Sequence, residues 1–293
     1  MVVQWLLLPI MFGLGRCVTV LSWSVHWQCG SYPSCRTVAE QRLLELTSET
    51  DPDFVVAIEL EKDANTPINL TSAGLGGYAS VPGSCVGAPG HAGDAVALGV
   101  APGYTVVASG GGCLNAFNES ARAFAVALVT PPAPVEGCAE LCVVGLHAPH
   151  GYINNGSDIV AETCGEAALN CAIAAGDWNV FIDYANWPAD FFEPVPAGFP
   201  NVSQVWTMLV PSTTPLTVQT PDRRTCCYPD NLHWGYDDHL VTNVKGVTNV
   251  TWNVFPYQVM EGSLAGNDTE EHKPLMVRFD LPLSQRSAMI ISV

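Results

Sequence analysis

The sequence predicts a single α/β domain built on packed β-sheets, and three observations lead to this fold class. A strand, a helix and a second strand follow one another at 18–25, 37–50 and 54–58. Short apolar runs, which are typical of buried strands, then recur along most of the chain. The 293 residues contain no internal repeat, no block of like charge and no obvious linker. Because strands outnumber helices, packed sheets with a few helices are expected.

Each of the first three elements has a pattern of its own. The segment "VTVLSWSV" (18–25) alternates apolar and polar residues, which predicts a strand. In "TVAEQRLLELTSET" (37–50) the apolar residues recur at three- and four-residue steps, which predicts a helix with one apolar face. Pro52 then turns the chain into the continuous apolar run 54–58, which predicts a buried strand.

The rest of the chain reads as strands joined by turns, with one more helix. The region 62–92 is rich in Gly, Pro, Ser and Asn, so a loop is expected there. A helix is expected over about 157–170, and the turn-rich segment 130–137 predicts a hairpin between the strands on either side. Further strands are predicted at 94–100, 104–109, 123–129, 140–147, 203–210, 239–244, 250–255 and 274–281.

The N-terminus has the features of a secretory signal peptide. Its apolar segment, 5–14, is too short to span a bilayer but fits the apolar region of such a peptide, although the usual preceding basic residue is missing. Small residues suit cleavage before Arg16 or before Val18, and the alternative is a buried first strand. We therefore expect 1–17 to be a signal peptide and 18–293 to be one domain. The protein is expected to be secreted or to lie in the secretory-pathway lumen, and not to span a membrane.

Cysteines and glycosylation motifs support secretion independently. There are eleven cysteines, and removing Cys17 leaves an even set that fits disulfides in an oxidising compartment. The closely spaced pairs could each close a local loop, although spacing alone does not fix connectivity: Cys29 and Cys35, Cys138 and Cys142, and Cys164 and Cys171. Asn-x-Ser/Thr motifs, which suit a glycosylated surface, occur at Asn69, Asn118, Asn155, Asn201, Asn249 and Asn267.

The charge balance limits the partners. Lys and Arg total 11 against 28 Asp and Glu, which gives a formal net charge of −17. This argues against wide, sequence-blind binding to nucleic acid, because such binding uses many basic contacts to phosphate. It does not exclude a site that handles phosphate through a metal ion, since the ion brings its own positive charge.

Several predicted strands end or begin at a polar side chain able to do chemistry. Strand ends that meet at one edge of a sheet are a common place for an active site. Carboxylates and an asparagine suit oxygen-coordinated Mg²⁺, Mn²⁺ or Ca²⁺, and two histidines suit a general acid and a general base. The residues in question are Glu59, His147, Asp177, Asn179, Asp237, Asp238, Glu271 and His272.

The order of these segments resembles the endonuclease/exonuclease/phosphatase superfamily, the fold of pancreatic-type deoxyribonuclease. The similar segments are "PDFVVAIE", "CVVGLHAPHG", "AAGDWNV", "YDDHLVTN" and "EEHKPLMV", and the resemblance covers nearly the whole chain from about Val18. It implies a four-layer sandwich of two mainly antiparallel β-sheets flanked by helices. It also implies an enzyme that hydrolyses a phosphoester with a divalent cation, Mg²⁺ in the first place and Mn²⁺ or Ca²⁺ as alternatives.

The resemblance also implies a role for each matching residue. Glu59 and Glu271 would bind the cation. His272, oriented by Asp238, would take a proton from water, and His147 would protonate the leaving oxygen. Asn179 would hold the phosphate or the attacking water. The residues implied to be catalytic are His147, His272, Asp177, Asn179 and Asp238, and those implied to bind substrate are Ser24 and Arg122.

Two positions depart from the family pattern, and one has an alternative register. Ser24 stands where the family's first strand usually has an asparagine, so activity could be weakened or one metal contact supplied by water. Glu271 replaces the usual aspartate, which keeps the charge and lengthens the arm. Arg122 lies where the family often has an arginine before a strand. Asp237 is the alternative to Asp238.

The substrate and even the activity stay open at this point. A phosphodiesterase or endonuclease suits the histidine pair and secretion, whereas a phosphatase or sphingomyelinase-like hydrolase suits the low basic content. The partner is thus a nucleic acid, a phospholipid or a small phosphoester, and no stable protein partner is implied. A non-catalytic secreted glycoprotein that keeps the fold is a further alternative, motivated by Ser24. Zinc held by His147, His150 and a carboxylate is another, although Pro149 would break a helix there.

Overall fold

The computed structural model describes residues 15–25, 33–63, 66–85, 94–114, 122–149, 156–179, 202–212, 217–219, 225, 238–255 and 272–284. The side chains of 33–36 and 61–67 are excepted. The statements that follow concern these residues.

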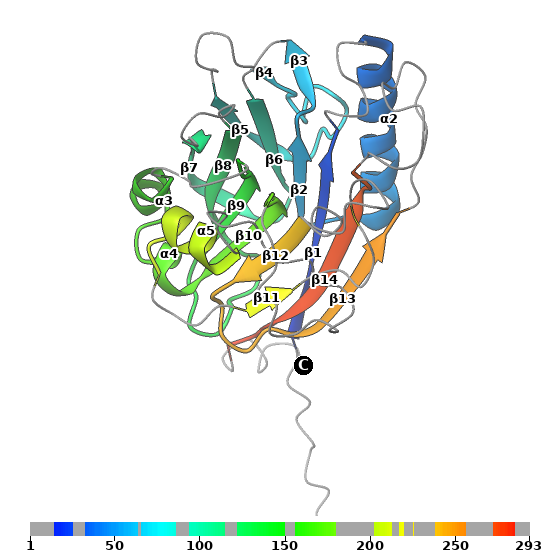
Figure 1. The fold of residues 1–293 in the computed structure, drawn as a ribbon. Helices are drawn as coiled ribbons and strands as arrows, with labels where there is room; N and C mark the ends of the chain where they lie inside the picture. Colours follow the sequence, from blue (N-terminus) through cyan, green and yellow to red (C-terminus); the bar gives the residue numbers. More distant parts are fainter. Residues whose placement is uncertain are drawn as a thin grey trace, which may run out of the picture.

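Twelve strands form two six-stranded sheets, and Figure 1 shows the sheets packed against each other. The first sheet contains, in spatial order, β13 (Thr248–Val254), β14 (Leu275–Pro282), β1 (Gly15–Ser24), β2 (Phe54–Ile58), β6 (Asp94–Val100) and β5 (Ala79–Cys85). The second contains β11 (Thr217–Gln219), β12 (Asp238–Thr242), β10 (Ala172–Asp177), β9 (Leu141–His147), β8 (Arg122–Thr130) and β7 (Thr105–Leu114). A short ribbon, β3 (Glu61–Asp63) and β4 (Thr66–Pro67), lies beside them.

The two sheets share one pattern of strand direction. The central pair is parallel in each, β1 with β2 and β10 with β9, and the other four pairs are antiparallel. The sheets are therefore mainly antiparallel, as the family resemblance implied. In both sheets the two central parallel strands end at one edge of the sandwich. The antiparallel strands next to them begin at that same edge.

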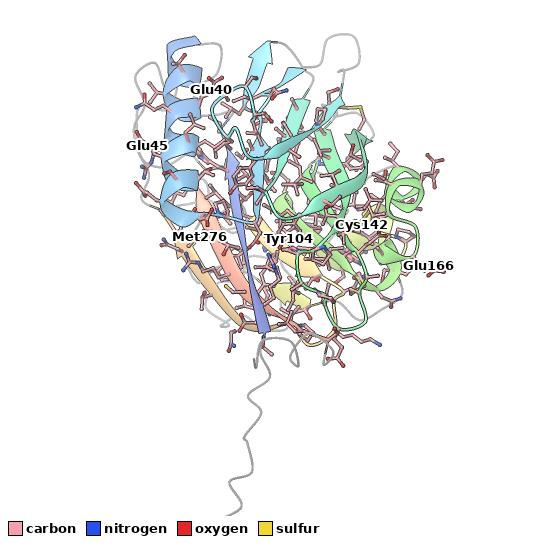
Figure 2. All side chains as sticks on the ribbon, turned by 180° about the vertical axis from the view of Figure 1, so that it is seen from behind. Glu40, Glu45, Tyr104, Cys142, Glu166 and Met276 are labelled. Atoms are coloured by element: carbon pink, nitrogen blue, oxygen red, sulfur yellow. A yellow bond between two sulfur atoms is a disulfide. The ribbon has the colours of Figure 1, made fainter. Side chains whose placement is uncertain are left out.

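Helices cover both outer faces, which makes four layers (Figure 1). Helix α2 (Pro33–Thr50) packs on the first sheet through Leu43 and Leu46. Helices α3 (Ser157–Cys164), α4 (Ala167–Asn170) and α5 (Val202–Leu209) pack on the second sheet. The reverse view places Glu45 of α2 and Glu166 beside α4 on opposite flanks (Figure 2). No helix in the described part of the chain is both long and apolar enough to cross a membrane.

The strands read as continuous apolar runs because both of their faces are buried. In β8, alternate residues face the core between the sheets, and the residues between them face the helices. The inner positions carry small residues, so the two sheets approach closely at this strand. The inward residues are Ala123, Ala125, Ala127 and Val129, and the outward ones are Phe124, Val126 and Leu128.

Most predicted elements are confirmed. The strands at 54–58 and 94–100 have the predicted bounds, and 130–137 joins the antiparallel strands β8 and β9. The helix expected over 157–170 is instead two helices, because Gly165 at φ +53° ends α3. A positive φ of this kind at a helix end is typical of glycine.

Two predictions were wrong. The segment 203–210 belongs to helix α5 and is not a strand, because its buried residues recur at helical spacing. The region 62–92 is not all loop, since it contains β5, an edge strand that accommodates Pro82 and Gly83. The buried residues of α5 are Val202, Val205, Trp206 and Leu209.

Three disulfides join described residues, and they correct the expected local pairing. They are Cys85–Cys113, Cys138–Cys171 and Cys142–Cys164. Cys138 and Cys142 do not bond to each other, because Cys138 belongs to the core between the sheets and Cys142 faces the helices. Cys17 is exposed and free. Cys29, Cys226 and Cys227 lie outside the described residues, and the side chain of Cys35 is not described.

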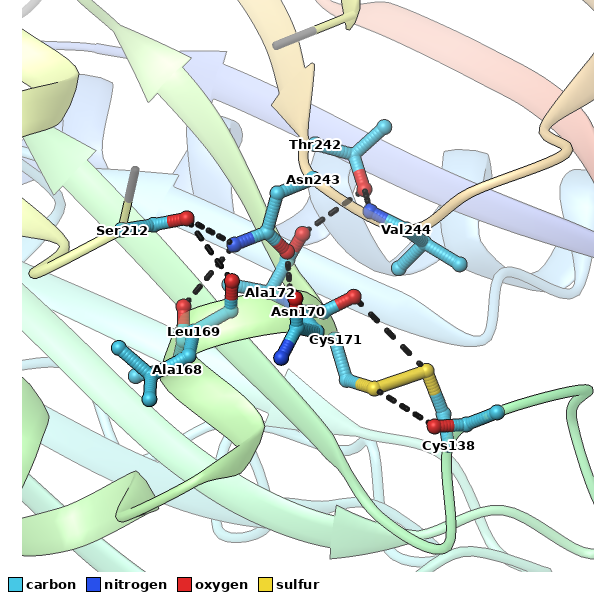
Figure 3. Close-up of a disulfide and its surroundings, with 11 residues drawn as sticks. Cys138, Ala168, Leu169, Asn170, Cys171, Ala172, Ser212, Thr242, Asn243 and Val244 are labelled. Carbon is cyan, nitrogen blue, oxygen red and sulfur yellow. Dashed lines mark hydrogen bonds between the residues drawn. A yellow bond between two sulfur atoms is a disulfide. The ribbon is translucent and has the colours of Figure 1, made fainter. Parts of the chain in front are cut away.

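Beside the Cys138–Cys171 disulfide, the Asn243 side chain ties three segments together (Figure 3). The Ala172 N–H donates to Asn243 Oδ1 at 2.7 Å. Asn243 Nδ2 donates to the Ala168 carbonyl at 2.9 Å and to Ser212 Oγ at 3.0 Å. The start of β10 is thereby fixed to the end of β12 and to α4, which sets the position of the strand that carries Asp177 at its other end.

Strand β1 begins at Gly15, so the last three residues of the predicted signal peptide lie in a strand. They pair with β14 residues 280–282. Arg16 Nη2 lies 3.0 Å from Asp53 Oδ1, and its guanidinium lies 4.9 Å from the ring centroid of Tyr104. Residues 1–14 lie outside the described part of the chain.

Candidate active site

The predicted site residues gather at one edge of the sandwich. Ser24, His147 and Asp177 end their strands, and Arg122 and Asp238 begin theirs. Glu59 follows β2, Asn179 follows β10 and His272 precedes β14. Two further residues of the sequence analysis, Glu271 and Asp237, lie outside the described residues.

Strand register places three of these residues side by side. Asp177 of β10 pairs with His147 of β9 on one side and with Asp238 of β12 on the other. Side chains of directly paired residues lie on the same face of a sheet, with Cβ atoms about 5 Å apart. The face in question is the one that looks toward the first sheet, since Ile173 and Ala175 of β10 belong to the core between the sheets.

The glycine before Asp177 is required by the close approach of the neighbouring strand. Gly176 has φ +141°, and a Cβ atom built on it would lie 2.1 Å from the Leu146 carbonyl oxygen. No other residue fits that space or readily adopts that backbone conformation. The Gly-Asp-Trp-Asn sequence therefore forms the end of β10, and the absence of a side chain at Gly176 lets Asp177 lie directly beside the parallel strand β9.

The two residues after Asp177, Trp178 and Asn179, have side chains on opposite faces of the sheet. Asn179 has φ +45°, a conformation that asparagine tolerates. Its backbone N–H donates to Asp177 Oδ1 at 3.1 Å, and its Nδ2 donates to the Ala148 carbonyl at 2.9 Å. Trp178 is fully buried on the helix side of the sheet and donates from Nε1 to the His239 carbonyl. Trp178 is therefore part of the core between this sheet and its helices.

Two histidines converge on Asp177. Its Oδ2 lies 3.6 Å from Nε2 of His147 and 3.6 Å from Nε2 of His272. His272 Nδ1 lies 3.7 Å from Asp238 Oδ2, the partner that the resemblance implied. These separations exceed the 2.7–3.2 Å of protein hydrogen bonds, and catalytic contacts commonly tighten only when substrate is bound.

Asp94, which sequence reasoning missed, is the nearest carboxylate among the described residues to the other nitrogen of His147. His147 Nδ1 lies 3.1 Å from Asp94 Oδ2, and the same oxygen accepts the Ala123 N–H at 2.7 Å. Asp94 is fully buried at the first position of β6. The signal was present, because "DAVALGV" begins an apolar strand with a carboxylate, as "DHLVT" does with Asp238.

Glu59 is fixed by a backbone hydrogen bond, and its carboxylate lies close to two basic side chains. It has φ +55°, and its N–H donates to the Ala95 carbonyl at 2.9 Å. Its Oε1 lies 3.1 Å from Arg122 Nη1 and 3.7 Å from His147 Nδ1. Burial raises the pKa of Glu59 to about 7, although His147 and Arg122 act in the opposite direction.

The other buried acids and His147 have shifted pKa values for distinct reasons. Burial favours a raised pKa for Asp94, but His147 and Arg122 outweigh it and lower the pKa below its ordinary value. Burial and Arg122 act to lower the pKa of His147, but Asp94 and neighbouring carboxylates raise it overall. Burial raises the pKa of Asp238. The two shifts, down for Asp94 and up for His147, are those of an acid and a base that stabilise each other's charged forms.

The residues present fit a divalent cation. Ligand atoms of Glu59, Asp94 and His147 all lie within 4.8 Å of one another, and the three residues are buried. Asp94 Oδ1 and Ser24 Oγ are also buried without a hydrogen-bond partner among the described residues. The two carboxylates suit Mg²⁺ or Mn²⁺, and the imidazole also suits Zn²⁺ in the state where its ligating nitrogen carries no proton. His150, the other ligand of the zinc alternative, lies outside the described residues.

Solved structures of known proteins share this architecture. An endonuclease/exonuclease/phosphatase family protein from Bacteroides thetaiotaomicron is 16% identical with a TM-score of 0.54, over 92% of this chain and 100% of that chain. D. rerio TDP2 complexed with single-strand DNA product is 14% identical with a TM-score of 0.54, over 90% and 99%. A mannosyl-6-phosphatase from Bacteroides thetaiotaomicron is 15% identical with a TM-score of 0.51, over 89% and 99%.

Sequence comparison alone gives no such link. No protein-family model matches the sequence, and no curated protein matches it. The fold comparison covers about nine-tenths of the chain in each case. The chain therefore has the endonuclease/exonuclease/phosphatase fold, as the order of its motifs implied.

Proposed function

We propose that this protein is a secreted, divalent-cation-dependent phosphoester hydrolase. The observation that supports this most directly is the convergence of His147 and His272 on Asp177, each histidine with a second carboxylate at its other nitrogen. A histidine whose Nδ1 faces a carboxylate presents Nε2 to the reacting atoms in a fixed tautomer. Two such histidines supply a general acid and a general base on either side of one phosphate.

The chain's own residues divide the reaction between them. His272, oriented by Asp238, accepts a proton from the attacking water at Nε2. His147, whose pKa is raised beside Asp94, donates a proton from Nε2 to the leaving oxygen. Asn179, fixed by its bond to the Ala148 carbonyl, directs its second amide hydrogen toward the phosphate. Glu59, with Asp94 or Glu271, would hold the cation, which would supply positive charge to the phosphate oxygens.

A phosphodiester is the favoured substrate class, with nucleic acid as its first candidate. The support is the pair of histidines together with the proposed secretion, although the pair would serve the alcohol leaving group of a phosphomonoester equally well. A phosphatase or sphingomyelinase-like activity is the second candidate, and the net charge of −17 favours it over binding to long nucleic acids. Among proteins with this fold, one is named as a mannosyl-6-phosphatase and another was crystallised with a DNA product.

A side-by-side assay tests the proposal. Disulfide-bonded protein is given plasmid DNA, a generic bis-phosphodiester, a sugar monophosphate and sphingomyelin, each with Mg²⁺, Mn²⁺ or Ca²⁺. Activity on one of them should need the cation and fall by about a hundredfold or more in His147→Ala. Glu59→Gln should lose activity, whereas Glu45→Gln, the same change on the exposed face of α2, should keep it. No turnover with any substrate would sink the proposal.

A non-catalytic secreted glycoprotein is the competing function, and Ser24 supports it because a neutral hydroxyl stands at a strand end otherwise lined by acids. Under this alternative the protein binds a cation without turning over any phosphoester. Calorimetry with Mn²⁺ on wild type and Glu59→Gln reports binding independently of activity. Binding together with turnover in the assay above supports the hydrolase, whereas binding without turnover of any phosphoester supports the non-catalytic protein.

Secretion is proposed with cleavage before Arg16. Cleavage there keeps Arg16 in β1 and its ion pair with Asp53, whereas cleavage before Val18 would remove both. Two glycosylation motifs lie at exposed described positions, Asn69 and Asn249. Expression in secretory eukaryotic cells should give protein in the medium that begins at Arg16 and loses mass on enzymatic deglycosylation. Protein retained in the cytosol with residues 1–14 intact would contradict this.

A further inference from the structure

The disulfide between Cys85 and Cys113 lies next to the site and joins the two sheets. We propose that it positions Asp94 against His147, and so controls the proton donor of the proposed reaction. This inference rests on the proposed function for its kinetic consequences, whereas the positioning itself is a statement about the fold. Neither cysteine touches the reacting groups, so both are positioning residues.

Strand register puts the disulfide beside a hydrogen bond that makes the same connection. Cys85 pairs directly with Asp94 across β5 and β6 of the first sheet. Cys113 pairs directly with Ala123 across β7 and β8 of the second sheet. Asp94 Oδ2 accepts the Ala123 N–H at 2.7 Å. The hairpin of β5 and β6 is therefore joined to the hairpin of β7 and β8 by two adjacent bonds. One is the Asp94–Ala123 hydrogen bond, and the other is the Cys85–Cys113 disulfide.

Glycines allow the sheets to come this close. A Cβ atom on Gly83 of β5 would lie 2.0 Å from the Phe124 carbonyl oxygen of β8. A Cβ atom on Gly111 of β7 would lie 2.8 Å from the Gly83 Cα. The backbone of β5 thus lies directly on β7 and β8, and the Cα atoms of Cys85 and Cys113 are 4.8 Å apart. The disulfide joins the two sheets two residues along from this close contact.

Two contacts of the site cross between the sheets at this same corner. Asp94 belongs to the first sheet and His147 to the second, and they lie 3.1 Å apart. Glu59 follows a strand of the first sheet and Arg122 begins a strand of the second, and they also lie 3.1 Å apart. The attraction between charged groups falls as they move apart, so a small separation of the sheets here would weaken both contacts.

The Cys142–Cys164 disulfide provides a matched comparison within the same molecule. It closes a loop of similar length, with a sequence separation of 22 against 28 for Cys85–Cys113. The loss of either disulfide should therefore relax the unfolded chain to a similar degree. Cys142 lies near the start of β9, whereas His147 ends that strand, and Cys164 lies in α3 on the outer face. Its removal should leave the contact between the sheets in place.

The kinetic test compares Cys85→Ala/Cys113→Ala with Cys142→Ala/Cys164→Ala on the phosphoester that the wild type hydrolyses. The first variant should lose kcat by about tenfold to a hundredfold with KM changed by less than about threefold, as expected for a disturbed proton donor. The second should change kcat by less than about threefold at a temperature where both variants are folded. Equal losses in both variants would overturn the proposal.

A double-mutant cycle asks whether the disulfide acts through Asp94. If it does, removing Cys85 and Cys113 in an Asp94→Asn background should lower kcat by less than about twofold further. If the two losses multiply instead, the disulfide affects activity by another route and the proposal is wrong. This distinction holds even where the variants differ in stability, because each is compared with its own background.

A spectroscopic readout keeps the positioning question separate from activity. The hydrogen on Nδ1 of His147, which faces Asp94 Oδ2 at 3.1 Å, should give a downfield NMR signal that is absent in His147→Gln and Asp94→Asn. We expect the signal to be lost in Cys85→Ala/Cys113→Ala and kept in Cys142→Ala/Cys164→Ala. Should the first variant not fold, Cys113→Ser, which leaves Cys85 as a buried thiol, takes its place. Persistence of the signal without the disulfide would overturn the proposal whether or not the protein is active.

Discussion

The two ends of the sandwich treat polar groups in opposite ways. At the start of β10, Asn243 makes three hydrogen bonds of 2.7–3.0 Å, and two disulfides tie the surrounding turns and helices to the sheet. At the end of the same strand, Asp177 lies 3.6 Å from each of two histidines. Asp94 Oδ1 and Ser24 Oγ are buried there without a hydrogen-bond partner among the described residues.

This difference separates stability from chemistry along a single strand. A buried polar atom without a partner costs roughly 1–3 kcal/mol, so the site end is destabilising unless a ligand satisfies it. The satisfied network at the other end offsets that cost and holds β10 in register. Substitutions at the Asn243 end should therefore lower stability and spare turnover, whereas substitutions at the Asp177 end should do the reverse.

The largest expected effect is at Asp177. Asp177→Asn keeps an oxygen for the Asn179 N–H but removes the charge on which both histidines converge. We expect kcat to fall about 10²- to 10⁴-fold, with the melting temperature unchanged or higher because like charges near Glu59 and Asp94 are relieved. Steady-state kinetics and calorimetry measure the two quantities. A variant that is less stable and still active would reverse the assignment of the two ends.

The next effect is at Asn243. Asn243→Ala leaves the Ala172 N–H and the Ala168 carbonyl without their partner, so we expect a loss of about 3 kcal/mol in the free energy of unfolding. The kcat of the folded fraction should stay within about twofold of wild type. Denaturant unfolding measures the loss, and Asn253→Ala on the exposed face of β13 is the matched control. A loss no greater than that of the control would show that the network is not what holds this end.

Sequence reasoning found the site end more completely than the other end. The acids and histidines at strand ends follow from short local patterns, because a polar residue that terminates an apolar run is visible in the sequence. Asp94 was missed since its segment was read only as a strand, although it starts that strand just as Asp238 starts another. Its partner His147 belongs to the other sheet, and no local pattern reports a contact between sheets.

The stabilising end was beyond sequence reasoning for a related reason. Several pairings are possible among Cys138, Cys142, Cys164 and Cys171. The native pairing depends on whether each cysteine lies in the core between the sheets or on the helix side of the second sheet. Asn243 is the last residue but one of the predicted strand 239–244, yet it binds backbone groups of α4 and β10 that only the tertiary fold brings near. The helix α5 was read as a strand because its apolar run is short enough to fit either period.

A smaller effect concerns pH. Since the pKa of Glu59 is raised to about 7, its carboxyl is mostly protonated below that pH and ionised above it. A cation must displace that proton, so its affinity should weaken by up to about tenfold per pH unit as pH falls below about 7 and level off above about 8. Calorimetric titration with Mn²⁺ measures this. The dependence should flatten in Glu59→Gln, and an affinity that is constant down to about pH 5.5 would show that Glu59 is not a ligand.

The smallest effect removes one hydroxyl from each end. Thr242 Oγ1 donates to the Ala172 carbonyl at 2.8 Å and accepts the Val244 N–H at 3.1 Å, so Thr242→Val should cost about 1–2 kcal/mol in unfolding free energy. Ser24 Oγ is buried without such partners among the described residues, so Ser24→Ala should be neutral or should stabilise by up to about 1 kcal/mol. If Ser24 instead contacts the bound cation, Ser24→Ala should weaken Mn²⁺ binding measured above about pH 8, where the affinity no longer depends on pH. Equal losses of unfolding free energy in the two variants would mean that Ser24 Oγ has a hydrogen-bond partner in the folded protein. The site end would then contain no unsatisfied hydroxyl for a ligand to bind.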